Sequence, residues 1–375
     1  MTIKSTDWVF PKTTDEMEER FPIVQDMKDC AQSPEYHGEG DVWSHTKMVI
    51  GSMQQDPEWQ KLQPCEKEVL KASAFYHDIA KPKVSEVEDG VIRAKRHSTL
   101  GARMAREMLW NPALPDYYAA PWDIREYIAN LVMLHMLPFH FINKENPVYN
   151  IGASSYVVDN KHLAILARAD TNGRIQPRLS RTNALDTIEL FCDFCQEKDC
   201  FESPMGFQSD NARFRFFFEH KGDPCLDYYE EQKGKVIIMS ALQGSGKDYT
   251  IGKNYSTLPM TGFDNVRNEL KLKFGKQESL VQRQLKERTK VFMRTGQDFV
   301  FNATNTIKDV RATWIRRFRK YGYRIKIHYI EKPLKETMAN NRNRDAIVPE
   351  EVIYEKFSRL DIPTALECHE LERDV

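Results

Sequence analysis

The spacing of the apolar residues changes near residue 200, and this change is what most limits the folds open to the chain. Before it, apolar side chains recur at steps of three and four, as in Val69, Ala72, Phe75, Tyr76 and Ile79. That spacing places them on one buried helix face. Strands with a period of two are scarce in this part, so the sequence predicts an all-α domain here.

After residue 200, short runs rich in β-branched residues alternate with long helical patterns. The runs are 235–240, 299–302 and 324–330, and the helical patterns are 277–295 and 308–321. Strands that alternate with helices form a parallel α/β sheet. With 375 residues the chain is long enough for two cores. We therefore expect one domain over residues 1–205, a linker over 206–232 and a second domain over 233–375.

Positive charge is concentrated in the second domain, although the net charge of the chain is only −1. Between Lys271 and Arg344 there are twenty Lys or Arg residues against six Asp or Glu residues. A basic stretch in a nearly neutral protein suggests a polyanion bound at one place. The alternative is a solvated helical face, which the charges taken alone favour.

The seven cysteines are too few and too irregularly spaced for a disulfide framework. Cys192, Cys195 and Cys200 form a cluster without a matching second pair, which leaves open whether they bind zinc or are buried thiols. The start lacks the basic and apolar regions of a signal peptide, and no apolar stretch reaches membrane-spanning length. We expect a cytoplasmic protein without a membrane partner.

The segment 75–82 carries residues suited to metal chemistry. Pro82 disfavours helical geometry just before it, so His77 and Asp78 are expected in the last turn of a helix. His45 lies near the start of another helical pattern and Asp170 near the end of a third. Two histidines and two aspartates from separate helices make a mixed N/O site for Mn, Fe, Co, Ni or Zn rather than for calcium. Such an ion activates water and neutralises phosphate, as phosphoester hydrolysis requires.

These residues resemble the H…HD…D signature of the HD phosphohydrolase superfamily. The segments 37–46 and 77–81 are similar to the HD domain appended to bacterial CCA-adding enzymes, and the resemblance covers most of the first 200 residues. It implies one divalent transition metal bound by the side chains of His45, His77, Asp78 and Asp170. It also implies a second metal at His97 and His135, bridged by Asp78, and a contact between Lys81 and the scissile phosphate.

The predicted strand 235–240 continues directly into a glycine-rich loop with the residues Gly244, Ser245, Gly246, Lys247 and Asp248. The segment matches the phosphate-binding pattern G-x-x-x-x-G-K-[ST] with two departures, Ala241 for the first glycine and Asp248 for the hydroxyl residue. Glycines let backbone N–H groups approach a phosphate, and the next helix N-terminus and Lys247 add positive potential. The sequence therefore predicts a site for NTP with Mg²⁺.

From Lys233 to the end, the chain resembles the 5′-OH polynucleotide kinase domain of phage and bacterial RNA repair proteins. The match rests on the segments 261–267, 299–305 and 340–350. It implies that Asp264 is the general base on the 5′ hydroxyl and that Arg267 holds the 3′ phosphate of the acceptor. Arg342 and Arg344 would lie on a lid over the donor phosphates. Without the glycine-rich loop, these four residues would be surface charges, with Asp264 and Arg267 a solvent-facing i, i+3 pair.

One departure from that family concerns the metal. In related kinases the second strand usually ends in an acidic residue near Mg²⁺, whereas Asn302 stands there in this chain. An acidic residue, Asp248, instead occupies the Ser/Thr position of the loop. We hypothesise that the anionic partner of the magnesium has moved from the strand to the loop.

An HD domain joined to such a kinase domain resembles the bacterial HD-Pnk family of RNA end-healing enzymes. The resemblance implies removal of a 2′,3′-cyclic or terminal 2′ or 3′ phosphate by the first domain, and NTP-dependent phosphorylation of 5′-OH ends by the second. The partners would be RNA ends, with DNA ends left open, and a separate RNA ligase. Two alternatives stay open: a nucleotide-pool hydrolase fused to a kinase of nucleoside-like small molecules, and a non-catalytic sensor that regulates the HD domain.

Overall fold

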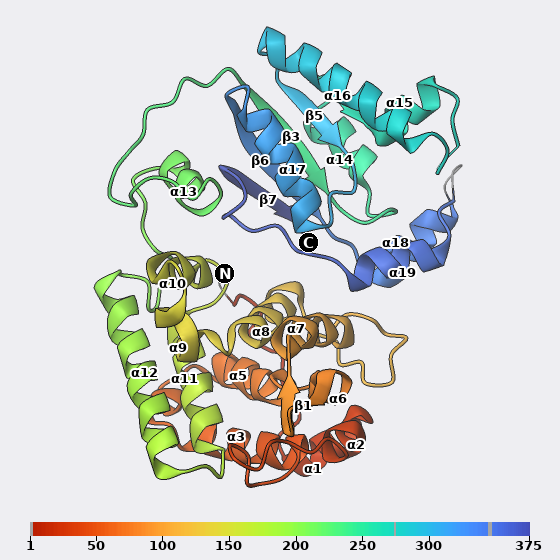
Figure 1. The fold of residues 1–375 in the computed structure, drawn as a ribbon. Helices are drawn as coiled ribbons and strands as arrows, with labels where there is room; N and C mark the ends of the chain where they lie inside the picture. The colour runs from red at the N-terminus through yellow and green to blue at the C-terminus, as the bar shows by residue number, and fades with distance from the viewer. Residues whose placement is uncertain (1–2, 274, 344–346) are drawn as a thin grey trace. The chain divides into compact units, whose positions relative to one another are not determined.

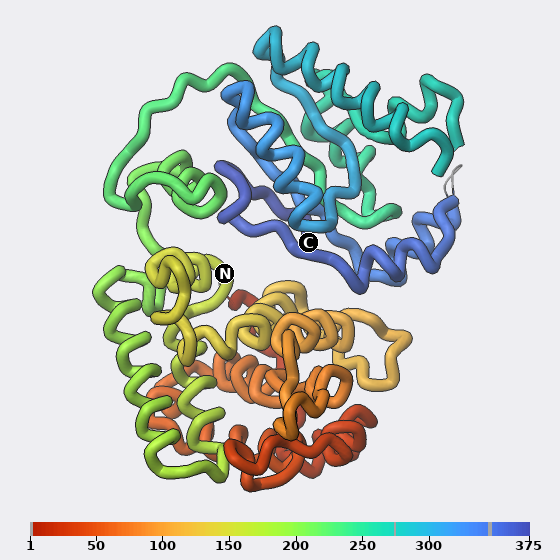
Figure 2. Tube along the Cα trace, viewed as in Figure 1, coloured from red at the N-terminus to blue at the C-terminus, as the bar shows by residue number. Residues whose placement is uncertain are grey.

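The computed structural model describes residues 3–273, 275–343 and 347–375 (Figure 1). The chain divides into two compact units, an N-terminal unit that ends at Gly206 and a C-terminal unit that begins at Phe207. The path of the backbone through each unit can be followed in Figure 2.

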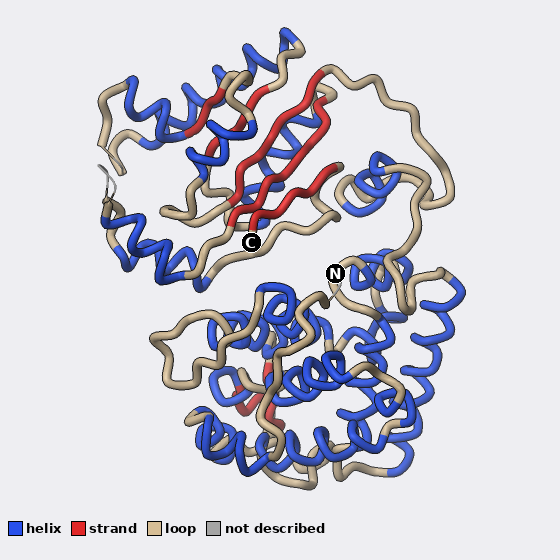
Figure 3. The backbone as a smooth tube through the Cα atoms, turned by 180° about the vertical axis from the view of Figure 1, so that it is seen from behind, coloured by secondary structure: helices blue, strands red, loops and turns tan. Residues whose placement is uncertain are grey.

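The N-terminal unit is built almost entirely of helices, as predicted (Figure 3). Its only sheet among the described residues is a short antiparallel hairpin of β1 (Ser85–Glu88) and β2 (Val91–Ala94). The helices are α1 (Thr14–Arg20), α2 (Ile23–Lys28), α3 (Val42–Gln55), α4 (Pro57–Gln60), α5 (Pro64–Tyr76), α6 (Lys81–Val84), α7 (His97–Met108), α8 (Trp122–Leu134), α9 (Leu137–His140), the 3₁₀ helix η1 (Phe141–Asn143), α10 (Pro147–Ser155), α11 (Asn160–Asn172) and α12 (Arg178–Glu197).

The ends of α5 and α6 produce the turn that carries the His-Asp pair. α5 begins with a capping box between Gln63 and Glu66 and ends at Tyr76, one residue before His77. α6 begins at Lys81 with a proline in its first turn, where a missing N–H is tolerated. His77 is the C-cap of α5 and keeps helical φ and ψ angles of −57° and −38°, so the His-Asp pair lies at the end of this helix.

A close approach of two helices brings the end of α11 to α3. A side chain on Gly173, the C-cap of α11, would come within 2.7 Å of the backbone nitrogen of Val49 in α3. Only a residue without a Cβ fits this contact. It sets the last turn of α11, with Asp170, against the helix that carries His45.

The C-terminal unit contains a five-stranded parallel sheet in the order β4-β5-β3-β6-β7, which agrees with the predicted α/β class. The strands are β3 (Gly234–Ser240), β4 (Met260–Gly262), β5 (Phe299–Asn302), β6 (Tyr323–Ile330) and β7 (Glu370–Asp374). The helices are α13 (Asp210–Phe217), α14 (Lys247–Asn254), α15 (Phe263–Glu269), α16 (Glu278–Thr295), α17 (Lys308–Arg319), α18 (Leu334–Arg342) and α19 (Glu350–Ser358).

Both faces of this sheet are covered, which explains why its central strand is a continuous apolar run. Val236 and Ile238 of β3 pack in a core with side chains from α15, α16 and α17. Ile237 and Met239 point to the opposite face and pack with Ile251 of α14. The loop that follows β3 therefore starts from a strand held on both sides.

The stretch 206–232, predicted to be a linker, contains a helix. α13 begins at a Ser209 cap whose hydroxyl accepts a hydrogen bond from the backbone N–H of Ala212. Phe214 of α13 is fully buried in the core of the C-terminal unit and stacks on His369 with a centroid distance of 4.2 Å. Phe214, with Phe218 packed against the same cluster, therefore belongs to the second core.

No helix in the described part of the chain has both the length and the apolar composition needed to cross a bilayer.

Candidate functional site

The N-terminal unit brings together the four side chains predicted to bind one metal. His45 Nε2 lies 3.0 Å from Oδ1 of Asp170 and 3.7 Å from Oδ2 of Asp78. His77 Nε2 lies 3.2 Å from the same Asp78 oxygen and 3.4 Å from His45 Nε2. All four residues are at most 2% exposed. They come from α3, the turn after α5, and α11, so the tertiary fold assembles them.

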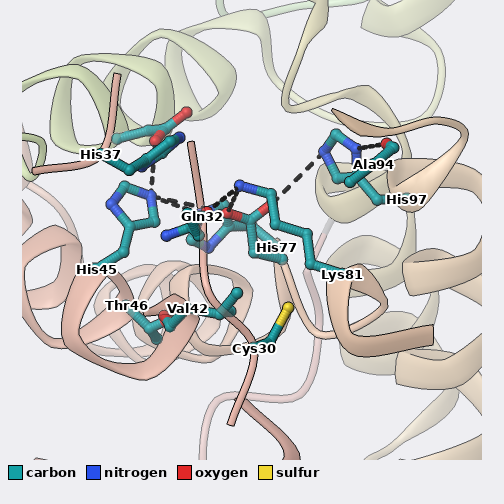
Figure 4. Close-up of polar contacts among 12 residues, drawn as sticks. Cys30, Gln32, His37, Val42, His45, Thr46, His77, Lys81, Ala94 and His97 are labelled. Atoms are coloured by element: carbon teal, nitrogen blue, oxygen red, sulfur yellow. Dashed lines mark hydrogen bonds and ion pairs between the residues drawn. The ribbon is translucent and has the colours of Figure 1, made fainter. Parts of the chain in front are cut away.

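The two further histidines lie on the other oxygen of Asp78. His97 Nε2 is 3.5 Å from Oδ1 of Asp78 and 3.2 Å from Nε2 of His135. Asp78 thus lies between two groups of potential ligands, one with His45 and His77 and one with His97 and His135. Figure 4 shows the side chains of His45, His77 and His97 converging on the region of Lys81.

The second ring nitrogen of each histidine is held away from this cluster. Nδ1 of His77, His97 and His135 each lies 2.7–2.8 Å from the backbone carbonyl oxygen three residues earlier, and Nδ1 of His45 lies 2.9 Å from Oε1 of Glu39. A carbonyl only accepts, so Nδ1 carries the proton and the lone pair is on Nε2. Nε2 atoms that face each other at 3.2–3.4 Å repel unless a cation lies between them. This donor set fits divalent transition ions.

The electrostatics of the cluster also favour a cation. Burial opposes ionisation of Asp78 and Asp170, but Lys81 and His77 beside the first and Arg174 and His45 beside the second hold both pKa values well below their usual range. Burial likewise opposes a charge on the His45 ring, yet Asp170 and Glu39 raise its pKa. The carboxylates therefore stabilise positive charge at the position that an ion would take.

The C-terminal unit forms a polar cavity of about 310 Å³ at the carboxyl end of β3. Four of the five predicted loop residues line it, namely Gly244, Gly246, Lys247 and Asp248, whereas Ser245 is buried and does not line it. Gly244 and Gly246 have φ angles of +88° and +89°, which glycine adopts without strain. Lys247 begins α14 and its Nζ donates to the carbonyl oxygen of Leu242 at 3.1 Å. The geometry suits an anion at a helix N-terminus.

Asp264 and Arg267 line the same cavity from α15. Nη1 of Arg267 lies 2.7 Å from Oδ1 of Asp264, and its Nε and Nη2 donate to the two carboxylate oxygens of Glu278 at 3.1 and 2.8 Å. The Asp264 side chain is 81% exposed, so it is open to a substrate, while Arg267 is held in a fixed orientation. The i, i+3 pair therefore exists, but it faces the phosphate loop and not only solvent.

Residues 42–170 match the family model of the HD domain, and residues 236–362 match a family model described as an AAA domain. The chain joins an HD phosphohydrolase domain to a P-loop kinase-like domain. Similar solved structures include a gluconokinase from Sinorhizobium meliloti 1021, at 11% sequence identity and a TM-score of 0.25, with 38% of this chain and 83% of that one covered. No curated protein matches the chain.

In the HD domain, a cavity of about 230 Å³ opens beside the cluster of potential metal ligands and is lined by several cationic and polar side chains. Nζ of Lys81 lies 2.7 Å from Oδ2 of Asp78 and donates to Oε1 of Gln32 at 2.6 Å. Nε of Arg174 donates to Oδ1 of Asp170 at 3.0 Å. Asp78, His97 and His135 of the ligand cluster line this cavity together with the two cations, an arrangement that suits a phosphate.

Sequence reasoning missed three residues of this site. Arg174 follows Asp170 by one helical turn, a spacing that is a usable signal. Glu39 lies in a segment that resembles the HD family, and its carboxylate also contacts Nδ1 of His37 at 2.8 Å. Gln32 has no signal in the sequence, because a β-bridge between Ala31 and Asp41 brings it to the site.

In the P-loop domain, the predicted lid residue Arg342 does not line the cavity. Arg342 ends α18, is exposed, and its Nε donates to Oε1 of Glu350 at 2.7 Å. Arg344 lies outside the described residues. Asn340 of α18 lines the cavity instead and donates to the carbonyl oxygen of Gly244 at 3.0 Å. Residues two positions apart lie on different faces of a helix, so the side chain of Arg342 does not point into the cavity with that of Asn340.

A lysine from α19 is a further cation of the kinase cavity that the sequence did not indicate. Lys356 lines it together with Asp264 and Arg267. Burial lowers the pKa of Lys356, against an opposing effect of Asp264. Lys356 follows both residues by about 90 positions in the sequence, so only the fold reveals it.

The three clustered cysteines of the HD-containing unit are buried thiols in the described structure. The Cys195 and Cys200 thiols hydrogen-bond to each other, and Nη1 of Arg168 lies 4.0 Å from Sγ of Cys192. Within the described ranges, no group of three or more metal-ligating atoms at ligand distance includes Cys192, Cys195 or Cys200. The zinc alternative finds no support there.

Proposed function

We propose that this protein heals RNA ends through two reactions. The HD domain removes a 2′,3′-cyclic or terminal 2′ or 3′ phosphate, and the P-loop domain transfers the γ-phosphate of an NTP to a 5′ hydroxyl. The observation that carries the proposal is the presence of Asp264 and Arg267 in the same cavity as Lys247 and Asp248. A carboxylate and a guanidinium beside a phosphate loop are what transfer to a phosphate-bearing acceptor requires.

In the kinase reaction, the P-loop backbone and Lys247 bind the donor phosphates. The carboxylate of Asp264 accepts the proton of the 5′ hydroxyl as that oxygen attacks the γ-phosphorus and the bond to the bridging oxygen breaks. Arg267, oriented by Glu278 through Nε and Nη2, donates to the acceptor's 3′ phosphate. Mg²⁺ that accompanies the nucleotide would neutralise developing charge, held on the protein side by Asp248.

In the HD reaction, His45, His77, Asp78 and Asp170 would hold one divalent transition ion, and His97 and His135 with Asp78 could hold a second. Such ions lower the pKa of bound water and stabilise the charge on phosphate. Lys81 and Arg174 bind the phosphate oxygens at the cavity wall. Glu39 orients His45 through its Nδ1.

Ends healed in this way carry a 5′ phosphate and a free 3′ hydroxyl, the substrates of a ligation reaction. We therefore propose RNA ends as substrates in the cytoplasm and a separate RNA ligase as the downstream partner. DNA ends are a second acceptor to be compared.

The decisive experiment uses an RNA oligonucleotide with a 5′-OH and a 2′,3′-cyclic phosphate, incubated with labelled NTP and with Mg²⁺, Mn²⁺, Co²⁺, Ni²⁺ or Zn²⁺. Transfer of label to the 5′ end and loss of the cyclic phosphate are expected. Parallel reactions with free nucleosides and nucleotides test the nucleotide-pool alternative, which preferential phosphorylation of a nucleoside would favour. Absence of transfer to every acceptor would favour the sensor.

A further inference from the structure

We propose that three exposed lysines, Lys271, Lys273 and Lys276, form a docking surface for the single strand of RNA that leads away from the kinase cavity. We call these residues the lysine track. The inference rests on the proposed polynucleotide kinase activity and adds to it a surface outside the cavity that holds the acceptor beyond its first phosphate.

The track continues from the acceptor site along the chain. α15 carries Asp264 and Arg267 and ends at Glu269, and the three lysines follow before α16 begins at Glu278. Glu278 is bonded to Arg267 through both carboxylate oxygens. The connection that bears the lysines is therefore tied at both ends to the residue assigned to the first acceptor phosphate. A strand that leaves Arg267 meets these lysines next.

The positive charge of the track is not neutralised. Across the residues that the structure describes, no carboxylate forms an ion pair with Lys271, Lys273 or Lys276, and all three are exposed. Other cations of the same basic region do have partners: Arg288 pairs with Glu269, and Arg311 with Glu367. The three lysines thus place unpaired positive charge next to the acceptor site, a few residues after Arg267.

A flexible single strand suits this surface better than a folded acidic partner. Lysine ammonium groups are hydrated point charges that neutralise phosphates without fixing a geometry. They therefore bind a backbone independently of its sequence, as a kinase that acts on varied broken ends requires. A repeating chain of phosphates that starts at Arg267 supplies the matching negative charges.

The test compares a track variant, Lys271→Gln with Lys273→Gln and Lys276→Gln, with a matched control, Lys233→Gln with Arg294→Gln and Lys320→Gln. The control residues are also exposed, but they lie just before β3, at the end of α16 and just after α17, at the amino-end edge of the sheet. Both variants of the full chain lose three positive charges. The control therefore accounts for the change in net charge.

Two acceptor substrates distinguish binding at the lysine track from binding in the cavity. A 5′-OH RNA 20-mer reaches the lysines, whereas a nucleoside 3′-monophosphate ends at the phosphate assigned to Arg267. We expect the KM for the 20-mer to rise roughly tenfold in the track variant, with the KM for the monophosphate unchanged. The salt dependence of 20-mer binding, measured by fluorescence anisotropy, should lose a slope of about 2 for three phosphate contacts on a single strand.

Equal KM values and equal salt slopes in the track and control variants would overturn the proposal. The anisotropy measurement decides this even if the 20-mer is not phosphorylated. Failure of the proposed function is seen separately, as an absence of label transfer by the unaltered protein.

Discussion

The side-chain amide of Asn302 donates a hydrogen bond to Oδ1 of Asp248 across 2.9 Å. Asn302 is the last residue of β5, and Asp248 is the second residue of α14. A carboxylate is favoured there because the helix N-terminus is partially positive. Of these two residues only Asp248 carries a charge, so the negative charge lies beside Lys247 and not at the end of the strand.

This arrangement predicts the outcome of exchanging the two residues. Asp248→Ser removes the only charge of the pair and should lower kinase activity roughly 10- to 100-fold at limiting Mg²⁺. Adding Asn302→Asp to that variant returns a carboxylate to the strand and should recover part of the loss. Initial rates across a Mg²⁺ titration, together with direct Mn²⁺ binding in the presence of NTP, measure both effects. Identical titrations for Asp248→Ser and the unaltered protein would refute the idea.

The two reactions should be separable by mutation because each cavity is built within its own unit. His77→Ala with Asp78→Ala removes a ligand and the shared carboxylate, so phosphate removal should be lost and label transfer to the 5′ end kept. Lys247→Ala should have the converse effect. Both activities are measured on the same RNA, and circular dichroism checks the fold. Loss of both activities in either folded variant would contradict separate sites.

The contact between the phosphate loop and α18 predicts a steric effect. A Cβ on Gly244 would lie 2.3 Å from the carbonyl oxygen of Thr337, and its φ of +88° is strained for alanine. Gly244→Ala should therefore raise the KM for NTP by roughly tenfold or more, equivalent to about 1.4 kcal/mol.

The matched control for this change is Gly252→Ala in α14. No atom lies within 4 Å of a Cβ there, so alanine should leave the KM unaltered and stabilise the helix by about 1 kcal/mol. Similar KM values in the two variants would show that the α18 contact does not matter.

The P-loop domain should lose stability in acid through His369. Burial is the largest cause that lowers the pKa of His369 to about 2, and the positive charges of Arg319 and Arg324 lower it further. Its Nδ1 accepts a hydrogen bond from the backbone N–H of Ile325 at 3.1 Å. The unfolded chain takes up this proton near pH 6.5, so it binds more protons than the folded domain below that pH. The contribution of His369 to the free energy of unfolding is thus fully present above pH 6.5. It falls by about 1.4 kcal/mol for each pH unit between pH 6.5 and pH 2.

His369→Asn keeps an acceptor but cannot titrate, so its stability should decline less steeply in this window. Pulse proteolysis in urea at pH 7, 6 and 5, with peptides of the C-terminal unit quantified, gives the slope. The same slope in both proteins would exclude His369 as the cause.

Local sequence was sufficient for features that depend on neighbouring residues. The glycine-rich loop after β3 and the turn with His77 and Asp78 were predictable because short-range sterics determine strand, loop and helix ends. The all-α and α/β classes followed from apolar spacing for the same reason. The helix within 206–232 was not predicted, because Phe214 is ordered by a distant core.

By itself, the sequence determined which chemical groups are present, their order, and the local shapes that expose them. Only the tertiary structure decided which groups share a cavity: Lys356 with Asp264, Gln32 with Lys81, and Asn340 rather than Arg342 with the phosphate loop. The physical reason is that these contacts join residues on different elements. Their directions depend on how whole helices and strands pack, and no local rule of spacing contains that information.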